Sequence, residues 1–179
     1  FLNYTWLIMI MFFEGKRVLV TGGTGFIGRN VVNRLISQKA ILRIIDKTAK
    51  HVFSYDRITY DEADISDKEN IERLVRYFNP EYIIHLAANN SHEETNEAIE
   101  DIKKTNVMGT KNILEAAKDI NYRRFIFLSS GEAYFGNKVP FREEDLWKGY
   151  PEETNAPYGL AKKMLLVQSQ SYREQYGFN

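Results

Sequence analysis

Apolar and polar residues follow each other in blocks along the chain from Lys16 onward. Short continuous apolar runs are followed by stretches in which apolar residues recur three or four positions apart. The runs are typical of strands buried on both faces, and the wider spacing is typical of amphipathic helices. We therefore predict strands at residues 17–21, 41–46, 58–62, 82–87 and 124–129.

The helical spacing is found in the segments that follow these strands. Apolar residues from Ile27 to Leu35 predict a first helix. Ser66 and Glu69 fit a capping box for a second helix, which Pro80 should stop. Two further helices are predicted at about 94–118 and 157–176.

Strands that alternate with helices in this way form a parallel sheet covered on both faces. The predicted fold class is therefore α/β, with a doubly wound parallel sheet. We assign residues 14–179 to this domain and residues 1–13 to an extra N-terminal segment. The apolar stretch 6–13 is too short to span a bilayer and lacks the flanks of a signal peptide. We expect a native start at Met9 or Met11, no membrane association and a cytoplasmic location.

Charge and cysteine content exclude several kinds of function. The formal net charge is zero, so nothing indicates binding to nucleic acid or to an anionic membrane. The sequence has no cysteine, which excludes disulfides, thiolate nucleophiles and cysteine-based metal sites. The three histidines, His51, His85 and His92, show no metal-ligand spacing, and no metal site is predicted.

Three glycines stand between the first predicted strand and the first helix. Gly22, Gly25 and Gly28 occur in the sequence V-T-G-G-T-G-F-I-G. Such glycines permit a tight turn, a close approach of the backbone to a pyrophosphate and close packing of helix on strand. The free N–H groups of the helix N-terminus then face the anion. The loop predicts a nucleotide site, although a plain strand–helix turn gives the same spacing.

Asp46 ends the second predicted strand, where an acid accepts hydrogen bonds from the adenosine ribose hydroxyls and repels a 2′-phosphate. This favours NAD over NADP as the cofactor. Lys47 follows directly and could weaken the repulsion.

Tyr158 and Lys162 form a Y-x-x-x-K pair on the last predicted helix, where residues four apart share a face. A nearby ammonium stabilises phenolate, so we expect a lowered pKa for Tyr158 and action as a general base. Ser129 and Ser130 end the fifth predicted strand, at the sheet edge where ligands of such folds bind. Ser130 could hydrogen-bond the reacting oxygen of a substrate.

In these motifs the chain resembles the extended short-chain dehydrogenase/reductases, in the branch of NAD-dependent nucleotide-sugar epimerases and dehydratases. The motifs, in family order, are T-G-G-T-G-F-I-G at 21–28, Asp46, Asp64-Ile65, H-L-A-A at 85–88, N-V-M-G-T at 106–110, S-S-G-E-A-Y at 129–134 and Tyr158 to Lys162. The resemblance implies a Rossmann-like fold. It also implies that the strands and the substrate domain that follow in the family are missing here, and that the 179 residues alone are weakly active or inactive.

The resemblance also implies roles for single residues. Ser130, Tyr158 and Lys162 would be catalytic. The cofactor would contact Phe26, Ile27, Lys47, Asp64, Ile65, Leu86, Ala87, Ala88, Asn106, Ser129, Tyr158 and Lys162, besides the three glycines and Asp46. His85 is expected to be a packed core residue. Glu132 stands where sugar dehydratases and uronic-acid decarboxylases carry a catalytic glutamate, although a solvated loop acid is the alternative.

Members of this family oxidise a hydroxyl of a nucleotide-activated sugar, usually at C4, and Tyr158 would remove its proton. The same residues allow a reductase acting on a non-sugar carbonyl or hydroxyl, or a non-catalytic NAD(P)-sensing protein. Relatives dimerise through two helices per subunit, so the resemblance implies a homodimer through the helices at about 94–118 and 157–176.

Overall fold

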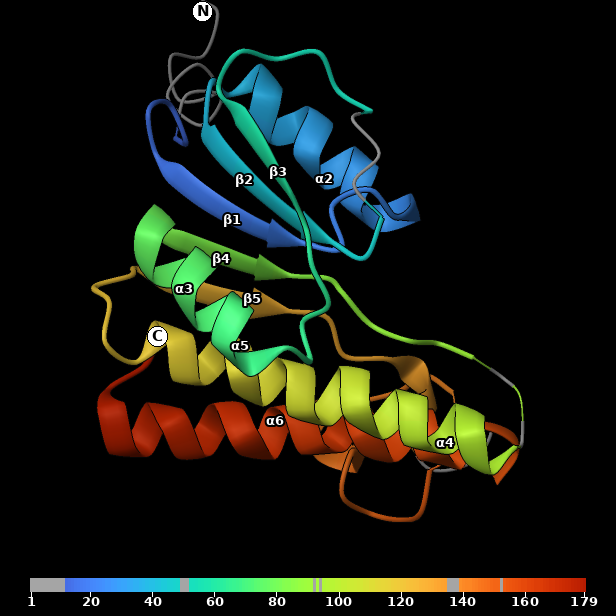
Figure 1. Ribbon diagram of the computed structural model, residues 1–179. Coiled ribbons are helices and arrows are strands. Elements are labelled where there is room, and N and C mark those ends of the chain that lie inside the picture. The colour runs from blue at the N-terminus through green and yellow to red at the C-terminus, as the bar shows by residue number, and fades with distance from the viewer. Residues whose placement is uncertain (1–11, 49–51, 92, 94, 135–138, 152) are drawn as a thin grey trace, which may run out of the picture.

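The computed structural model describes residues 12–48, 52–91, 93, 95–134, 139–151 and 153–179. At its centre is a parallel sheet with the strand order β3-β2-β1-β4-β5 (Figure 1). The strands are β1 (Arg17–Thr21), β2 (Ile41–Asp46), β3 (Ile58–Glu62), β4 (Tyr82–His85) and β5 (Arg124–Phe127). The chain starts in the middle of the sheet, moves outward to β3 and returns to β4, so the doubly wound arrangement is confirmed. β4 and β5 end earlier than predicted.

The helices lie on both faces of this sheet (Figure 1). They are α2 (Phe26–Ser37), α3 (Lys68–Phe78), α4 (Asn96–Ile102), the π-helix η1 (Lys103–Gly109), α5 (Thr110–Ala117), α6 (Ala156–Tyr176) and the 3-10 helices η2 (Gly131–Ala133), η3 (Glu143–Asp145) and η4 (Glu153–Asn155).

Successive strand residues point to opposite faces of the sheet. Leu19 packs with apolar residues of α3 and α5 on one face. Val20 packs with apolar residues of α2 on the other face. Because both faces are covered, β1 is apolar along nearly its whole length, as the sequence pattern indicated.

The start of α3 differs from the prediction. Asp67 is the N-cap, and its side chain accepts a hydrogen bond from the backbone N–H of Asn70 at 3.2 Å. The N–H of Ser66 instead donates to Oδ1 of Asp64 at 2.8 Å, so Ser66 belongs to the turn after β3. The helix ends as predicted before Pro80, with Asn79 in the left-handed conformation.

The helix predicted at about 94–118 is not uniform. α4, η1 and α5 follow one another directly, and the middle segment is π-helical. Gly109 closes this segment against Ile65, since a Cβ at position 109 would lie 2.6 Å from Cδ1 of Ile65. π-helical turns occur frequently at functional sites, and this one buries Thr105 and Asn106.

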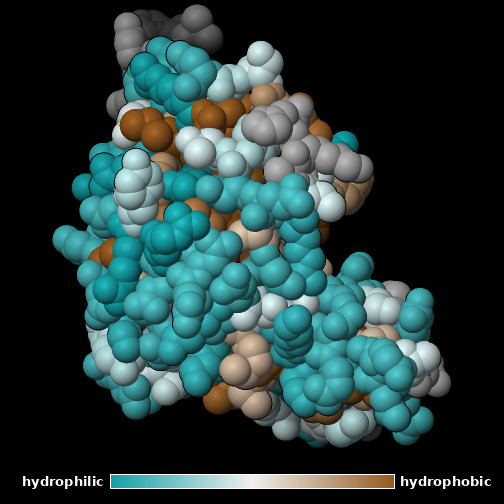
Figure 2. Space-filling model, viewed as in Figure 1, coloured by the Kyte–Doolittle hydropathy of each residue, from teal (hydrophilic) through white to brown (hydrophobic). Residues whose placement is uncertain are grey.

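α6 packs against α4, η1 and α5 as an outer layer. Its N-terminal end lies beyond the carboxyl ends of β4 and β5 (Figure 1). The face of the molecule shown in Figure 2 is mainly hydrophilic, with hydrophobic groups in separate spots. In the described part of the chain, no helix combines the length and the apolar character needed to cross a membrane.

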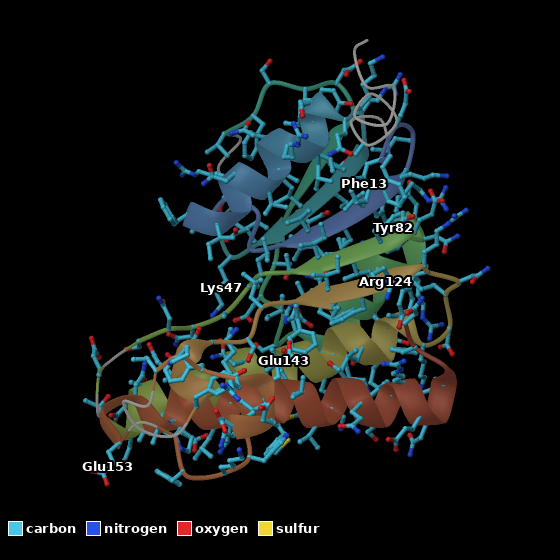
Figure 3. The ribbon with its side chains drawn as sticks, turned by 180° about the vertical axis from the view of Figure 1, so that it is seen from behind. Phe13, Lys47, Tyr82, Arg124, Glu143 and Glu153 are labelled. Atoms are coloured by element: carbon cyan, nitrogen blue, oxygen red, sulfur yellow. The ribbon has the colours of Figure 1, made fainter. Side chains whose placement is uncertain are left out.

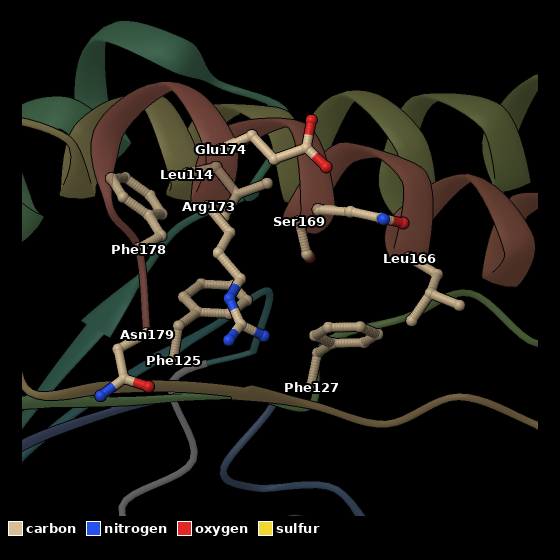
Figure 4. Close-up of a pocket in the computed structure, with 10 residues that line it drawn as sticks. Leu114, Phe125, Phe127, Leu166, Ser169, Arg173, Glu174, Phe178 and Asn179 are labelled. Atoms are coloured by element: carbon tan, nitrogen blue, oxygen red, sulfur yellow. The ribbon is translucent and has the colours of Figure 1, made fainter.

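A cleft of about 710 Å³ lies between β5 and α6 (Figure 4). Phe125 and Phe127 of β5 lie opposite Leu166 and Arg173 of α6 across it. The carbonyl oxygen of Asn179 accepts a hydrogen bond from the N–H of Phe125 at 2.8 Å, so this residue extends the sheet edge. None of the predicted site residues lines this cleft.

Residues 1–11, which make up most of the predicted N-terminal segment, lie outside the described residues, as do His51 and His92. The rings of Phe12 and Phe13 lie 5.8 Å and 5.1 Å from the ring of Tyr82, measured between centroids. Figure 3 shows Phe13 and Tyr82 at the end of the sheet opposite to Lys47.

Candidate cofactor-binding and active site

The glycine-rich loop lies against the segment that follows β4. Gly22 has a φ of +69°, and a Cβ there would lie 2.7 Å from the backbone nitrogen of Ala87. At Gly28 a Cβ would lie 2.1 Å from the carbonyl oxygen of Gly22. Side chains at these two positions would force the loop away from β4 and from α2. The first and third glycines therefore have the roles that the sequence predicted.

Gly25 is the N-cap residue of α2 and provides no side chain to cap the helix. The first N–H groups of α2 are therefore available to a ligand at the positive end of the helix dipole. A pyrophosphate fits this position, because backbone N–H groups at a helix N-terminus bind phosphate oxygens. Phe26 is 89% exposed and Ile27 50% exposed at this helix start.

A cleft of about 550 Å³ runs from this loop across the carboxyl ends of β1, β2 and β4. Several predicted cofactor residues line it, namely Gly22, Gly25, Asp46, Lys47, Ile65, Leu86, Ala87 and Ala88. The predicted residues that do not line it are Phe26, Ile27, Gly28, Asp64, Asn106, Ser129, Tyr158 and Lys162. Sequence reasoning missed the lining residues Thr24, Arg29, Ile45, Thr48, Ala63, Asn89, Asn90 and Thr105. The positions of Thr24 within the glycine motif and of Asn89 directly after H-L-A-A were the available signals.

Asp46 is held in place by the glycine loop. Its Oδ2 accepts hydrogen bonds from the backbone N–H of Thr24 at 3.0 Å and from the Thr24 hydroxyl at 2.7 Å. These contacts orient the carboxylate at the mouth of the cleft. Asp46 lines the cleft, and its role of binding ribose hydroxyls stays a prediction.

Asn106 connects η1 to the segment after β4. Its Oδ1 accepts a hydrogen bond from the N–H of Asn89 at 2.7 Å, and its Nδ2 donates to the carbonyl oxygen of Asn89 at 2.8 Å. The side chain is 1% exposed. Asn106 thus lies beside the cleft and holds one of its walls rather than lining it.

His85 lies beneath the same wall and is buried, so its predicted place in the core is confirmed. Nδ1 lies 2.7 Å from the hydroxyl of Thr21, and Nε2 lies 3.0 Å from the hydroxyl of Thr110. The Thr110 hydroxyl donates to the carbonyl oxygen of Asn106 at 2.6 Å, so it accepts from Nε2–H of His85. Nδ1 then accepts from Thr21, whose oxygen accepts the N–H of Ala87 at 3.2 Å. Burial lowers the pKa of His85 to about 3, and the charge of Lys162 contributes, so the ring is neutral.

The second part of the site is formed where α6 meets the segment after β5. Gly159 allows this approach, since a Cβ there would lie 2.5 Å from the carbonyl oxygen of Glu132. Ser130 hydrogen-bonds the phenol of Tyr158. Nζ of Lys162 lies 5.5 Å from the centroid of the Tyr158 ring and donates to the carbonyl oxygen of Leu128 at 2.8 Å. The structure therefore brings together the three residues predicted to be catalytic.

Glu132 also lies in this group. Its carboxylate accepts a hydrogen bond from Nδ2 of Asn155, which directly precedes α6. The Glu132 N–H donates to Oγ of Ser130 at 3.3 Å. Glu132 therefore has defined partners, in contrast to the alternative of a solvated loop acid. Ser129, which precedes Ser130 in the segment after β5, is exposed.

The expected lowering of the Tyr158 pKa is wrong for the chain without ligand. Burial raises the pKa of the phenol, the charge of Glu132 raises it further, and the hydrogen bond with Ser130 lowers it. Lys162 is directed to the carbonyl oxygen of Leu128, and burial lowers its own pKa. Tyr158 is therefore a phenol at neutral pH.

Residues 18–179 match the family model of the NAD dependent epimerase/dehydratase family. This chain belongs to that family. The resemblance found in the motifs is thereby confirmed, and the Rossmann-like fold agrees with it. The family match covers both the glycine loop and the Tyr158 group.

Members of the family with known names or structures match over nearly the whole of this chain. The dTDP-glucose 4,6-dehydratase of Haemophilus influenzae is 27% identical, over 89% of this chain and 52% of its own length. The UDP-glucose 4-epimerase of Thermotoga maritima, solved with UDP-glucose, is 32% identical with a TM-score of 0.80, over 90% of this chain and 52% of that one. The Thermus thermophilus UDP-glucose 4-epimerase, solved with NAD, is 31% identical with a TM-score of 0.77, over 90% and 52%. This chain spans about half the length of the curated relatives that it matches.

Proposed function

We propose that this chain binds NAD and carries the catalytic groups of an enzyme that epimerises or dehydrates a nucleotide-activated sugar. The reaction would start with the transient oxidation of a sugar hydroxyl, at C4. The observation that carries the proposal is the joint position of Ser130, Tyr158 and Lys162 where α6 meets the end of β5. Family membership supports it.

The residues of the cleft fit NAD. The uncapped N-terminus of α2 would bind the pyrophosphate, and Asp46 would accept hydrogen bonds from the adenosine ribose. Ile65 and Leu86 supply apolar walls. When bound, NAD would supply the hydride acceptor and, in its oxidised form, a positive charge that lowers the pKa of Tyr158.

The chain's own residues would then handle the proton. Ser130 would hydrogen-bond the substrate oxygen and Tyr158 would accept the hydroxyl proton. Lys162 would stabilise the phenolate from its position over the ring. Glu132, held by Asn155, would serve as the acid or base of a later step, such as loss of water.

Groups that bind the sugar nucleotide are proposed to come from a part of the protein that corresponds to the rest of the relatives' length. Positioning of the reacting groups supplies a large part of catalysis. We therefore expect residues 1–179 alone to turn over sugar nucleotides weakly or not at all, although they should bind the cofactor.

We also infer that a second copy of the chain covers the outer face of α6. Leu160, Met164 and Val167 lie at helical spacing on that face and are 43%, 44% and 46% exposed. Met108 of the neighbouring η1 is 45% exposed. A two-fold axis lets one such face pack against its own copy. Sedimentation should show a dimer, and Met164→Glu should make it monomeric.

The first test is the thermal midpoint of the chain with and without NAD⁺. A ligand at a hundred times its Kd stabilises by about 2.7 kcal/mol, which shifts the midpoint by several degrees. The chemistry is then tested by adding UDP-glucose or dTDP-glucose to the NAD⁺ complex and recording the absorbance of reduced nicotinamide, in full-length protein. Tyr158→Phe should abolish that signal, and the exposed Tyr77→Phe should preserve it.

Two other functions give different results. A reductase acting on a non-sugar substrate would bind NAD⁺ but would give no absorbance change with either sugar nucleotide. A cofactor sensor would bind NAD⁺ with the same affinity in wild type and Tyr158→Phe and would reduce no cofactor. Absence of NAD⁺ binding would contradict all three functions.

A further inference from the structure

Lys47 and Asp64 form an ion pair at the mouth of the cofactor cleft. Nζ of Lys47 lies 3.2 Å from Oδ2 of Asp64. The pair results from strand register, because Asp46 of β2 lies opposite Glu62 of β3. Lys47 and Asp64 therefore leave the two neighbouring strands at the same edge of the sheet.

The carboxylate of Asp64 is fixed on its other side. Its Oδ1 accepts the N–H of Ser66 at 2.8 Å, and its Oδ2 faces Lys47. Burial alone would raise the pKa of Asp64, but the hydrogen bonds from Ser66 and Lys47 together lower it. Asp64 is therefore charged at neutral pH and holds the ammonium on the β3 side of the cleft.

The lysine has a direct bearing on the choice between NAD and NADP. NADP differs from NAD by a phosphate on the adenosine ribose, and a basic side chain beside the acid at the end of β2 accommodates that phosphate in other dinucleotide sites. Lys47 occupies this place and lines the cleft. Asp46, Lys47 and Asp64 together carry a net charge of −1, whereas without Asp64 they would be neutral.

Among the described residues that line the cleft, Arg29 is the second cation, and it is also engaged. Nε of Arg29 donates to the carbonyl oxygen of Thr24 at 2.7 Å. Its guanidinium is thus tied to the glycine loop. At the ribose end of the cleft, Lys47 is the described cation whose position is set by a carboxylate.

We propose that Asp64 is a selectivity residue, which restrains Lys47 and so keeps the ribose end of the cleft from accepting a 2′-phosphate. The inference rests on the proposed binding of NAD. It assigns to Asp64 an action through Lys47, in addition to the contact with the cofactor that the resemblance implies. A contact with the adenine would affect NAD and NADP alike and would leave the ratio of the two affinities unchanged. A direct repulsion between Asp64 and the phosphate would change the ratio even without Lys47, so the action through Lys47 is isolated by comparing variants with and without this lysine.

The test is the ratio of the Kd for NADP⁺ to the Kd for NAD⁺, measured by calorimetry at low ionic strength, where charge effects are least screened. Asp64→Asn keeps an oxygen for the Ser66 N–H and removes the charge. An exposed ion pair is worth up to about 1 kcal/mol, so we expect the ratio to fall about fivefold. If Asp64 acts only through Lys47, the double variant Asp64→Asn with Lys47→Gln should have a ratio within about twofold of that of Lys47→Gln alone. Two independent effects would instead add in the double variant.

Glu69→Gln is the matched control, because it removes the same charge from the first turn of α3 without changing a residue that lines the cleft. Its ratio should equal that of the wild type. Asp64→Ser replaces Asp64→Asn if the latter does not fold, and the same fall is expected. An unchanged ratio in a folded Asp64 variant that still binds NAD⁺ would overturn the selectivity role alone, and so would a fall that persists without Lys47. If the wild type binds neither cofactor, the selectivity role and the proposed function are both wrong.

Discussion

Asn106 and Asn89 are joined by two reciprocal hydrogen bonds, in which the side-chain amide of Asn106 pairs with the backbone N–H and carbonyl of Asn89 at 2.7 Å and 2.8 Å. The amide thus acts on Asn89 as a neighbouring strand would. The pair joins the π-helical turn to the segment after β4, which forms one wall of the cleft. The shape of the cofactor cleft therefore depends on a residue that does not line it.

Replacing Asn106 should weaken NAD⁺ binding and stability together. Asn106→Asp keeps an acceptor for the Asn89 N–H but loses the donor to the carbonyl oxygen and brings a carboxylate towards it. Leaving a buried polar group unpaired costs about 1–3 kcal/mol. Urea unfolding and calorimetry with NAD⁺ would measure both effects.

Asn30→Ala serves as the control, because the Asn30 amide donates within its own helix, to the carbonyl oxygen of Phe26, on the exposed side of α2. This variant should change both quantities little. Unaltered NAD⁺ affinity in Asn106→Asp would show that the wall does not depend on the pair.

The stability of the protein should fall in acid because of His85. Its folded-state pKa of about 3 lies below the unfolded value of 6.5. Below pH 6.5 the unfolded chain therefore binds a proton that the folded chain does not, and the free energy of unfolding falls as the pH drops towards 3. At pH 4.5 this group should cost about 2–3 kcal/mol relative to pH 7.

The measurement is urea unfolding at the two pH values, in the wild type and in His85→Gln. Other groups titrate equally in both proteins, so the variant should lose less stability on acidification by about the amount due to His85. Equal losses in the two proteins would show that His85 is protonated in the folded state.

Ser130 and Glu132 should change the Tyr158 pKa in opposite directions. Ser130→Ala removes the hydrogen bond that lowers this pKa, so the pKa should rise further. Glu132→Gln removes a charge that raises it, so the pKa should fall. Both shifts can be measured by NMR of ring-labelled tyrosine in a pH titration. The Tyr158→Phe variant identifies the signal of Tyr158. Shifts of the same sign in both variants would contradict this assignment of causes.

Because the pKa of Tyr158 is raised in the folded chain, ionisation of this phenol should lower the free energy of unfolding at alkaline pH. Below the unfolded pKa of 10 the phenol is neutral in both states, and its contribution to stability is complete. Above that value the unfolded chain ionises first, so the contribution is lost as the pH rises through the folded pKa.

Gly159→Ala should move α6, which carries Tyr158, away from the segment after β5, which carries Ser130. A Cβ at this position would lie 2.5 Å from the backbone oxygen of Glu132, which cannot move aside as a side chain tip can. The forced shift of α6 should lower stability by about 1–3 kcal/mol, as overpacking does elsewhere, and should disrupt the hydrogen bond between Ser130 and Tyr158. Thermal unfolding and the tyrosine NMR signal measure these two effects.

Gly131→Ala is the matched control for this substitution. Its Cβ would meet the side chain of Phe141 at 3.3 Å, and that ring can shift. The variant should be nearly as stable as the wild type. If both alanines are tolerated equally, close packing at Gly159 does not hold the site together.

The strands, the glycine loop and the order of the motifs were predictable from the sequence because each depends on neighbours a few residues away. A strand buried on both faces is an apolar run wherever it occurs, as residues 17–21 show. Gly22 and Gly28 could be assigned for the same reason, since the turn that they form joins two adjacent elements. The position of Tyr158 and Lys162 on one face of α6 follows from helical spacing alone.

What only the tertiary structure decided are the contacts between segments distant in the chain. Lys47 was ambiguous in the sequence, and strand register places it beside Asp64. The direction of the Tyr158 pKa depends on burial and on Glu132, neither of which a motif records. Local patterns are set by backbone geometry over one or two turns, whereas charge environment and burial are set by the packing of whole elements. For this reason the sequence could supply candidate residues for the site, but not their protonation or their partners.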